Sequence, residues 1–333
     1  MATISDVAAR AGVSTATVSR ALNGKSTVDP ALAARVQAAA TELGYHPNAL
    51  ARNLRRQETA VLALIISDVE NPFFTAIARG VEDIAQTAGY SVVLCNSDEN
   101  EEKERRYIDV ALQERVAGVV LSPIGKSTNV DVLRERGTPV VAVDRPLVGV
   151  TGDQVLVDTR RAARVATEHL LANGYRRIGC VTGPDGVRTA DDRLAGYRDA
   201  LRGATGATAA GELVRRAEYR ATGARHATLE LLGEAEPPDA LLVANSTMAI
   251  GVLEALASRG LRAGRDVGVV AFDDAPWTTL IDPPLTVVAQ PAYEIGTVAA
   301  KLLLARISGG SCERTATVLE ARLIERASSR RDA

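Results

Sequence analysis

The sequence predicts an α/β core of two doubly wound parallel-sheet lobes, preceded by an all-α N-terminal segment. From residue 60 onward, short runs rich in Val, Ile and Leu alternate with helical runs, in two successive series. Continuous apolar strands joined by helices are typical of parallel sheets that are buried on both faces. Residues 1–59 show helical periodicity only. The length of 333 residues allows two or three domains.

The first two helices are predicted from their capping residues. Thr3 and Asp6 have the spacing of a capping box, so a helix is expected from there to about residue 11. Gly12 permits a tight turn after it. Ser14 is a good N-cap for a second helix that would extend to Asn23.

A third helix completes the N-terminal segment. Asp29-Pro30 is a typical helix start, and Gly44 ends the helical pattern. Two short helices joined by a glycine turn and closed by a third indicate a helix-turn-helix. Small polar residues and Arg20 on the second helix suit the DNA major groove. The alternative is a generic three-helix cap.

The charge distribution favours a nucleic-acid partner for this segment. Residues 1–60 contain seven Lys or Arg and four Asp or Glu, a difference of +3. The whole chain carries −2, so −5 remains for the rest. A basic head on an acidic body is typical of DNA-binding proteins, although solvated helices also carry such charge.

The core divides into two series of strands and helices. Strands are expected at 61–66, 91–94, 118–121, 139–143 and 155–157, and then at 177–181, 240–243, 267–272 and 285–288. Helices are expected at 74–88, 102–114, 130–136, 160–173, 192–201, 222–232 and 248–259. Two series indicate two lobes with a cleft between them, and ligands of such sheets bind at the carboxyl ends of the strands.

Polar and aromatic residues follow these strands and form the candidate ligand site. Carboxylates and amides accept from hydroxyl groups, Arg donates, and aromatic rings cover apolar faces, so the set suits a polyhydroxylated ring. Each residue could instead cap a helix or form a turn, and the single Trp could belong to the core. The candidates are Asn71, Phe73, Phe74, Asp144, Arg145, Arg193, Tyr219, Asn245, Asp273, Trp277 and Gln290.

The second hypothesis is an enzyme, but the sequence motifs disfavour catalysis. The three histidines are His46, in the head, and His169 and His226, inside expected helices. No Gly-x-Ser-x-Gly elbow, phosphate loop or Gly-x-Gly-x-x-Gly turn occurs. The three scattered cysteines lack metal-ligand spacing. We therefore expect no catalytic residue, no metal and no cofactor.

The third hypothesis is a transport-type binding protein. The core would suit it, but the N-terminus has neither a basic start nor an apolar signal core. No apolar run approaches the ~18 residues of a membrane span. We therefore expect a cytoplasmic protein without a membrane partner.

A long motif in the head resembles a known family. The run from Thr3 to Ala8, the run from Ala11 to Asn23 and the run from Leu43 to Asn48 are similar to the head of the LacI/GalR (lactose/galactose repressor) family. The similarity continues through the core and covers nearly the whole chain. It implies a transcription repressor with a periplasmic-binding-protein-like core, although an activator or a repressor that answers to a protein fits equally.

The resemblance also implies roles for residues of the head. Those expected to read bases are Thr15, Ala16 and Arg20, and those expected to contact phosphates are Ser14, Thr17, Ser19 and Asn23. Leu54 matches the hinge leucine that family members wedge into the minor groove, although it could simply pack on the core. Tyr45, Asn48 and Ala51 join the expected DNA-binding set.

The expected organisation follows from this resemblance. It is a helix-turn-helix head at 1–46, a hinge helix and linker at 47–59 and an effector-binding core at 60–333. The N-lobe would hold about 60–160 and 291–320, and the C-lobe about 161–290 and 321–330.

The expected mechanism is allosteric. A homodimer would bind a pseudo-palindromic operator in double-stranded DNA, and a sugar bound between the lobes would release it as inducer. In the family, matching core positions contact the sugar. The chain departs from the family at Asn245-Ser246, where Asn-Asp is usual, which puts the effector chemistry in doubt. No leucine heptads follow the core, which favours a dimer over a tetramer.

Overall fold

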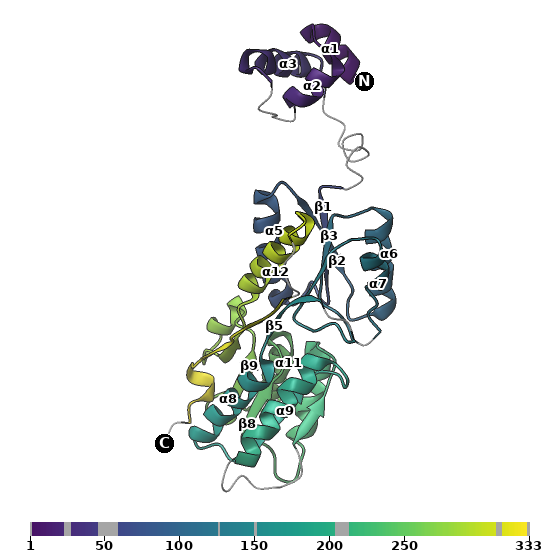
Figure 1. Ribbon diagram of the computed structural model, residues 1–333. Helices are drawn as coiled ribbons and strands as arrows, with labels where there is room; N and C mark the ends of the chain where they lie inside the picture. Colours follow the sequence, from purple (N-terminus) through teal and green to yellow (C-terminus); the bar gives the residue numbers. More distant parts are fainter. Residues whose placement is uncertain are drawn as a thin grey trace. The chain divides into compact units, whose positions relative to one another are not determined.

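The computed structural model describes residues 2–22, 28–45, 59–125, 127–149, 152–203, 213–310 and 315–331. The chain forms two compact units, Met1–Thr59 and Ala60–Ala333, which we call the head and the core (Figure 1). The predicted fold class is confirmed: the head is helical, and the core contains two α/β lobes.

Three helices pack together in the head. The capping box is confirmed, because Thr3 Oγ1 accepts from the Asp6 amide and the Asp6 carboxylate accepts from the Thr3 amide at 2.7 Å. Asp29 caps the third helix through the amides of residues 31 and 32. Val7, Val18 and Val36 are fully buried between the helices. The helices are α1 (Ile4–Ala11), α2 (Thr15–Leu22) and α3 (Pro30–Glu42).

The N-lobe contains a parallel sheet of strand order β11-β5-β4-β3-β1-β2. Its strands are β1 (Val61–Ile66), β2 (Ser91–Asn96), β3 (Gly118–Leu121), β4 (Val140–Val143), β5 (Asp153–Val157) and β11 (Ala316–Leu319). Its helices are α5 (Pro72–Thr87), α6 (Glu101–Gln113), α7 (Asp131–Glu135) and α12 (Ala292–Ile307).

The C-lobe contains a second sheet of order β12-β10-β9-β8-β6-β7, in which the edge strand β12 runs antiparallel to β10. Its strands are β6 (Ile178–Thr182), β7 (Val214–Arg216), β8 (Ala240–Val243), β9 (Gly268–Phe272), β10 (Thr286–Ala289) and β12 (Arg322–Ile324). Its helices are α8 (Thr159–Ala172), α9 (Arg188–Gly203), α10 (Ala221–Leu231), α11 (Ser246–Ser258) and the 3-10 turns η1 (Pro276–Thr279) and η2 (Ala327–Ser329).

Helices cover both faces of each sheet. In the N-lobe, α5 and α12 lie together on one face and α6 and α7 on the other (Figure 1). In the C-lobe, α8 pairs with α9 and α10 with α11. Glycines allow the α5–α12 contact, because a Cβ at Gly80 would lie 2.2 Å from the Tyr293 carbonyl oxygen. This layering explains why the strands are apolar on both faces.

Three connections join the lobes, because consecutive strands belong to different sheets after Val157, Ala289 and Leu319. Apart from the two 3-10 turns, four elements of the core escaped sequence prediction: α12 and the edge strands β7, β11 and β12. Two of the three residues of β7 are arginines, so β7 lacks an apolar run. The residues of β11 alternate between exposed and half-buried, so β11 also lacks a continuous apolar run. Edge strands meet water on one side and carry a weaker pattern.

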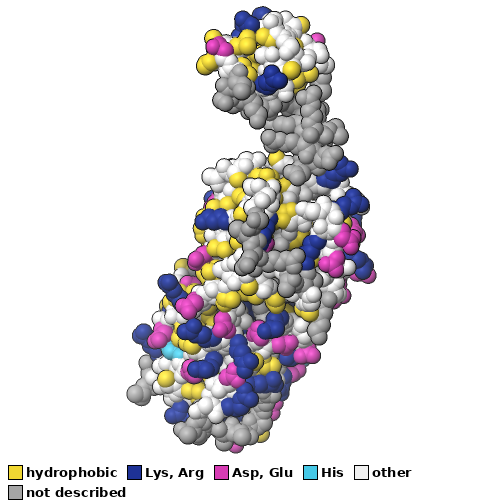
Figure 2. Space-filling view, viewed as in Figure 1, with side chains coloured by type: hydrophobic (Ala, Val, Ile, Leu, Met, Phe, Trp, Pro, Cys, Tyr) yellow, Lys and Arg dark blue, Asp and Glu magenta, His cyan; other side chains and the backbone are white. Residues whose placement is uncertain are grey.

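Charged side chains of both signs intermix over the visible face of the core, many of them in ion pairs (Figure 2). Within the described ranges, no helix combines the length and the apolar character needed to cross a membrane.

Candidate functional site: an exposed helix in the head and a cavity between the lobes

The head presents α2 as a candidate DNA-reading surface. Ser14, Thr15, Ala16 and Arg20 are exposed, whereas the predicted phosphate-contacting residues Thr17 and Ser19 are half-buried. The Ser14 hydroxyl caps the helix by accepting from the Thr17 amide at 3.2 Å.

Tyr45 is half-buried and packs against the apolar core of the head. The other predicted DNA-contacting residues lie outside the described residues: Asn23, Asn48, Ala51 and Leu54.

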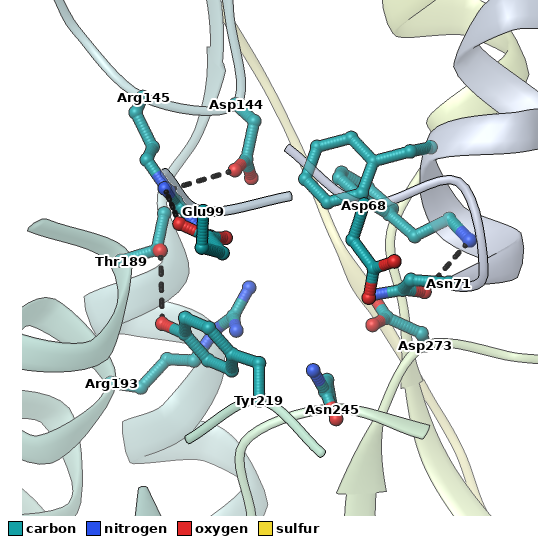
Figure 3. Close-up of a pocket in the computed structure, with 12 residues that line it drawn as sticks. Asp68, Asn71, Glu99, Asp144, Arg145, Thr189, Arg193, Tyr219, Asn245 and Asp273 are labelled. Atoms are coloured by element: carbon teal, nitrogen blue, oxygen red, sulfur yellow. Dashed lines mark hydrogen bonds and ion pairs between the residues drawn. The ribbon is translucent and has the colours of Figure 1, made fainter. Parts of the chain in front are cut away.

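A cavity lies between the lobes, where the carboxyl ends of strands from both sheets meet. Nine of the eleven predicted ligand residues line it. From the N-lobe come Asn71, Phe73, Phe74, Asp144 and Arg145, and from the C-lobe come Arg193, Tyr219, Asn245 and Asp273 (Figure 3). The structure therefore brings together residues that are up to 202 positions apart in the sequence, from Asn71 to Asp273.

Two predicted residues do not line this cavity. Gln290 lines a neighbouring pocket with Phe73 and Asp273, and its side-chain amide donates to Asp273 Oδ1 at 2.7 Å. Trp277 is half-buried and packs against the C-lobe core, which agrees with the alternative prediction that the single Trp belongs to the core.

Three further lining residues were missed: Asp68, Glu99 and Thr189. The reason lies in the element boundaries. β2 continues to Asn96, two residues beyond the predicted strand, so Glu99 was not recognised as following a strand. Helix α9 begins at Arg188, four residues earlier than predicted, and places Thr189 in its first turn. A search of the five residues after each predicted strand would have found both Asp68 and Glu99.

Arg193 is a buried guanidinium with spare hydrogen-bonding capacity. Its Nη1 donates to the Ala244 carbonyl oxygen at 2.7 Å, and the guanidinium carbon lies 4.4 Å from the centroid of the Phe272 ring. Its Nε is buried without a partner among the described residues. A buried charged donor left unpaired is costly, so this side chain is well suited to donate to a ligand.

Two buried carboxylates face the same space as Arg193 (Figure 3). Burial raises the pKa of Asp273 to about 6, although Arg193 and the hydrogen bond from Gln290 oppose the shift. Burial also raises the pKa of Asp144, against the attraction of Arg145 and Arg193. Carboxylates held out of water gain most from new hydroxyl donors.

Arg145 is already engaged. Its Nη atoms donate to both carboxylate oxygens of Glu99, at 2.8 and 2.6 Å. Its buried Nε lies 3.4 Å from Asp144 Oδ2 but has no hydrogen-bond partner among the described residues. The bidentate pair fixes the guanidinium beside Asp144.

Four acidic residues at or beside the cavity adopt left-handed backbone conformations: Asp98, Glu99, Asp144 and Asp273, with φ of 55°, 51°, 64° and 73°. Such φ values are uncommon outside glycine and cost free energy. Strained residues that persist in a fold concentrate at ligand clamps and switch regions, which supports this cavity as the functional site.

The two asparagines at the cavity are N-caps. Asn71 Oδ1 accepts from the Phe73 amide at 3.0 Å, and Asn245 Oδ1 accepts from the Met248 amide at 2.7 Å. Capping orients each side chain, so a structural and a ligand-binding role are compatible. The hydroxyl of Ser246, which replaces the usual carboxylate, is buried without a partner among the described residues.

Aromatic rings from both lobes border the cavity. Phe73 and Phe74 are both buried and form an edge-to-face pair with centroids 5.1 Å apart. Tyr219 approaches from the C-lobe, and its hydroxyl lies 3.5 Å from the Thr189 hydroxyl. Gly183 makes room for this ring, because a Cβ there would lie 2.3 Å from Tyr219 Cζ. Rings, carboxylates and two buried arginines therefore line one cavity, a combination of groups that suits a small polar ligand.

Among the described residues, no group of three or more His, Cys, Asp or Glu side chains is arranged to hold a metal ion. His169 and His226 lie in α8 and α10, away from the cavity lining. His46 lies outside the described residues.

Comparisons with known proteins agree with this architecture. Residues 3–48 match the bacterial regulatory proteins of the lacI family, and residues 167–329 match a periplasmic binding protein-like domain. The ribose operon repressor of Halalkalibacterium halodurans is 37% identical over 311 residues, which cover 92% of this chain and 91% of that protein.

Two solved structures extend the comparison. The lac repressor dimer bound to operator and the anti-inducer ONPF superposes with a TM-score of 0.87 at 27% identity, covering 99% of each chain. A LacI family regulator from Enterococcus faecium with bound ribose gives a TM-score of 0.73 at 26% identity, covering 81% of this chain and 98% of that one. The predicted family is thus confirmed: the chain belongs to the LacI family and is a DNA-binding transcription repressor, not an enzyme.

Proposed function

We propose that a small neutral sugar binds in the cavity between the lobes and lowers the affinity of the repressor for its operator. The observation that carries this proposal is the buried donor of Arg193 facing the carboxylates of Asp144 and Asp273. Sugar hydroxyls can donate to the carboxylates and accept from the guanidinium.

Charge narrows the ligand class. Arg145 is neutralised by Glu99, which leaves Arg193 against two carboxylates, Asp144 and Asp273. A phosphorylated sugar would meet this excess of negative charge in a low-dielectric site, so we propose an unphosphorylated effector.

Ribose is the first candidate. The relative from Halalkalibacterium halodurans is named for the ribose operon, and the regulator from Enterococcus faecium holds ribose. The proposed ligand residues are those of the cavity, with Arg193, Asp144, Asp273 and Asn245 as polar contacts and the three rings as walls.

On the DNA side we propose a homodimer acting in the cytoplasm on a pseudo-palindromic operator. Thr15, Ala16 and Arg20 would read bases, and Leu54 would enter the minor groove. The lac repressor structure with its operator supports a two-fold arrangement of this kind. We propose a single hinge-and-linker segment at 47–59 between the head and the core.

Isothermal titration of the full chain with D-ribose tests the proposal, with D-ribose 5-phosphate, D-glucose and cellobiose as comparison ligands. We expect binding of ribose and at least tenfold weaker binding of the phosphate. An operator selected from random duplex DNA then reports induction, seen as release of DNA on addition of ribose. Arg193→Gln should abolish ribose binding, whereas Arg188→Gln, on an exposed arginine of the same helix paired with Asp192, should not. The absence of binding by all four sugars would refute a sugar effector of this class.

A further inference from the structure

One arginine of the C-lobe reaches three carboxylates of the N-lobe. Arg220 Nη1 lies 2.9 Å from Asp68 Oδ2 and 2.8 Å from Glu70 Oε2, and Nη2 lies 2.5 Å from Asp98 Oδ1. Arg220 precedes α10, whereas the acids follow β1 and β2 of the other sheet. These contacts therefore exist only while the two lobes are close together.

The loop that carries Asp98 belongs to the N-lobe and contacts the C-lobe. Asp98 and Glu99 are consecutive non-glycine residues with left-handed backbones. They face a second consecutive pair, Tyr219 and Arg220. Asp98 contacts Arg220 directly. Glu99 binds Arg145, whose guanidinium carbon lies over the ring of Tyr219, at 5.8 Å from the ring centroid. Two adjacent strained residues thus form an outer contact at Arg220 and an inner contact at the cavity wall.

The cluster around Arg220 carries more negative than positive charge. Three carboxylates share Arg220, with one further cation, Lys103, at 3.2 Å from Asp98. Asp68 is buried, lines the cavity and also accepts from the Glu70 amide at 3.0 Å. Separation of the lobes would remove the shared cation and leave clustered carboxylates to repel one another, one of them in a low-dielectric position.

We propose that Arg220 is a closure latch: a positioning residue that holds the lobes together over the cavity without contacting the effector. It restrains the bound sugar from leaving, because the lobes must separate first, and it biases the equilibrium between closed and open cores. The first effect rests on the proposed sugar site, whereas the second is a property of the lobes alone.

The interlobe distance measures the latch without any ligand. Spin labels at Arg106→Cys on α6 and Arg225→Cys on α10, both exposed positions, report the separation of the lobes in the full chain. Cys312 is replaced by Ser, Cys95 and Cys180 are buried, and excess unlabelled chain ensures one labelled subunit per dimer. Arg220→Gln should shift the distances to longer values, and 1 M salt should shift the unsubstituted chain in the same direction.

Arg216→Gln is the matched control. Arg216 lies in the same lobe, has a side-chain exposure of 30% against 33% for Arg220, and pairs with Asp185 and Asp191, both also in the C-lobe. Its loss removes a comparable ion cluster but should leave the distance unchanged. Equal distances for Arg220→Gln and Arg216→Gln would overturn the latch.

A second variant and a rate measurement complete the test. Asp98→Asn removes one charge while Asn tolerates the left-handed backbone, so it should open the lobes partially even if Arg220→Gln fails to fold. Stopped-flow release of D-ribose should be roughly tenfold faster in Arg220→Gln, within the usual range of coupling between sites. Unchanged distances refute the latch, whereas a chain that opens but never binds ribose refutes the sugar and leaves the latch standing.

Discussion

Asp273 gives a prediction in which stability and binding change in opposite directions. Burial raises the pKa of this carboxyl from 3.8 to about 6. Because the folded state binds the proton more tightly than the unfolded state, the chain loses stability as the pH rises through the window from about 4 to 6, and the loss persists above it. Asp273→Asn removes the buried charge and should therefore stabilise the protein at neutral pH.

The magnitude follows from the size of the shift. About two pKa units at 1.36 kcal/mol each give about 3 kcal/mol. Asparagine keeps an acceptor for Gln290 and tolerates the φ of 73°, but it offers one acceptor oxygen in place of two, which costs about 1 kcal/mol. The net gain of about 2 kcal/mol corresponds to a Tm increase of about 4 °C for a core of this size.

Thermal unfolding of the full chain at pH 7.5 and pH 4.5 measures the effect. We expect Asp273→Asn to unfold about 4 °C higher at pH 7.5, with no gain at pH 4.5, and to lose ribose binding. Asp274→Asn is the control, because Asp274 is paired with Arg326 at 2.8 and 2.9 Å and its loss should lower Tm. A Tm for Asp273→Asn at or below that of the unsubstituted chain at pH 7.5 would refute the reasoning.

Three further predictions test other parts of the molecule. Gly183→Ala should overpack the ring of Tyr219, lower stability by about 1–3 kcal/mol and weaken ribose binding in a titration, whereas Gly203→Ala, which meets open space, should do neither. Arg20→Ala should weaken operator binding by about 1–3 kcal/mol in a mobility-shift assay, and equal binding would exclude it as a base-reading residue. Leu280 is 82% exposed, the most of any large apolar side chain in the described ranges, and we predict that the partner subunit covers it; Leu280→Asp should therefore convert the dimer to monomers in sedimentation, and an unchanged dimer would place the interface elsewhere.

Much of the fold was predictable because local signals and burial agree. The capping box of Thr3 and Asp6 and the cap at Asp29 are local, so the head helices could be located from sequence alone. Strands such as β1 are buried along almost their whole length, which forces a continuous apolar run. The edge strands β7 and β12 have water on one side, and only pairing with a distant strand defines them.

The candidate site was predictable to the extent that strand ends reveal it. Asp144 and Asp273 follow apolar strands directly and could be located from the sequence. Glu99 is the fifth residue after the predicted strand 91–94 and was also within reach of a search beyond the strand ends. Thr189 was not, because its place depends on where helix α9 begins. The partners of Arg145 were also beyond prediction. A sequence identifies a buried arginine as a donor, but only the fold shows that Glu99 occupies it.

The same loops shape the cavity and hold the lobes together, and this has a consequence for coupling. Tyr219 lines the cavity while its neighbour Arg220 contacts the other lobe, and Glu99 lines the cavity while its neighbour Asp98 receives that contact. Any ligand that moves these loops by a fraction of an ångström acts on the lobe contact through a single peptide bond. Coupling in this protein therefore requires no extended pathway from the cavity to the lobe interface. It requires only that the closed arrangement of the two residue pairs binds the effector more tightly than the open one.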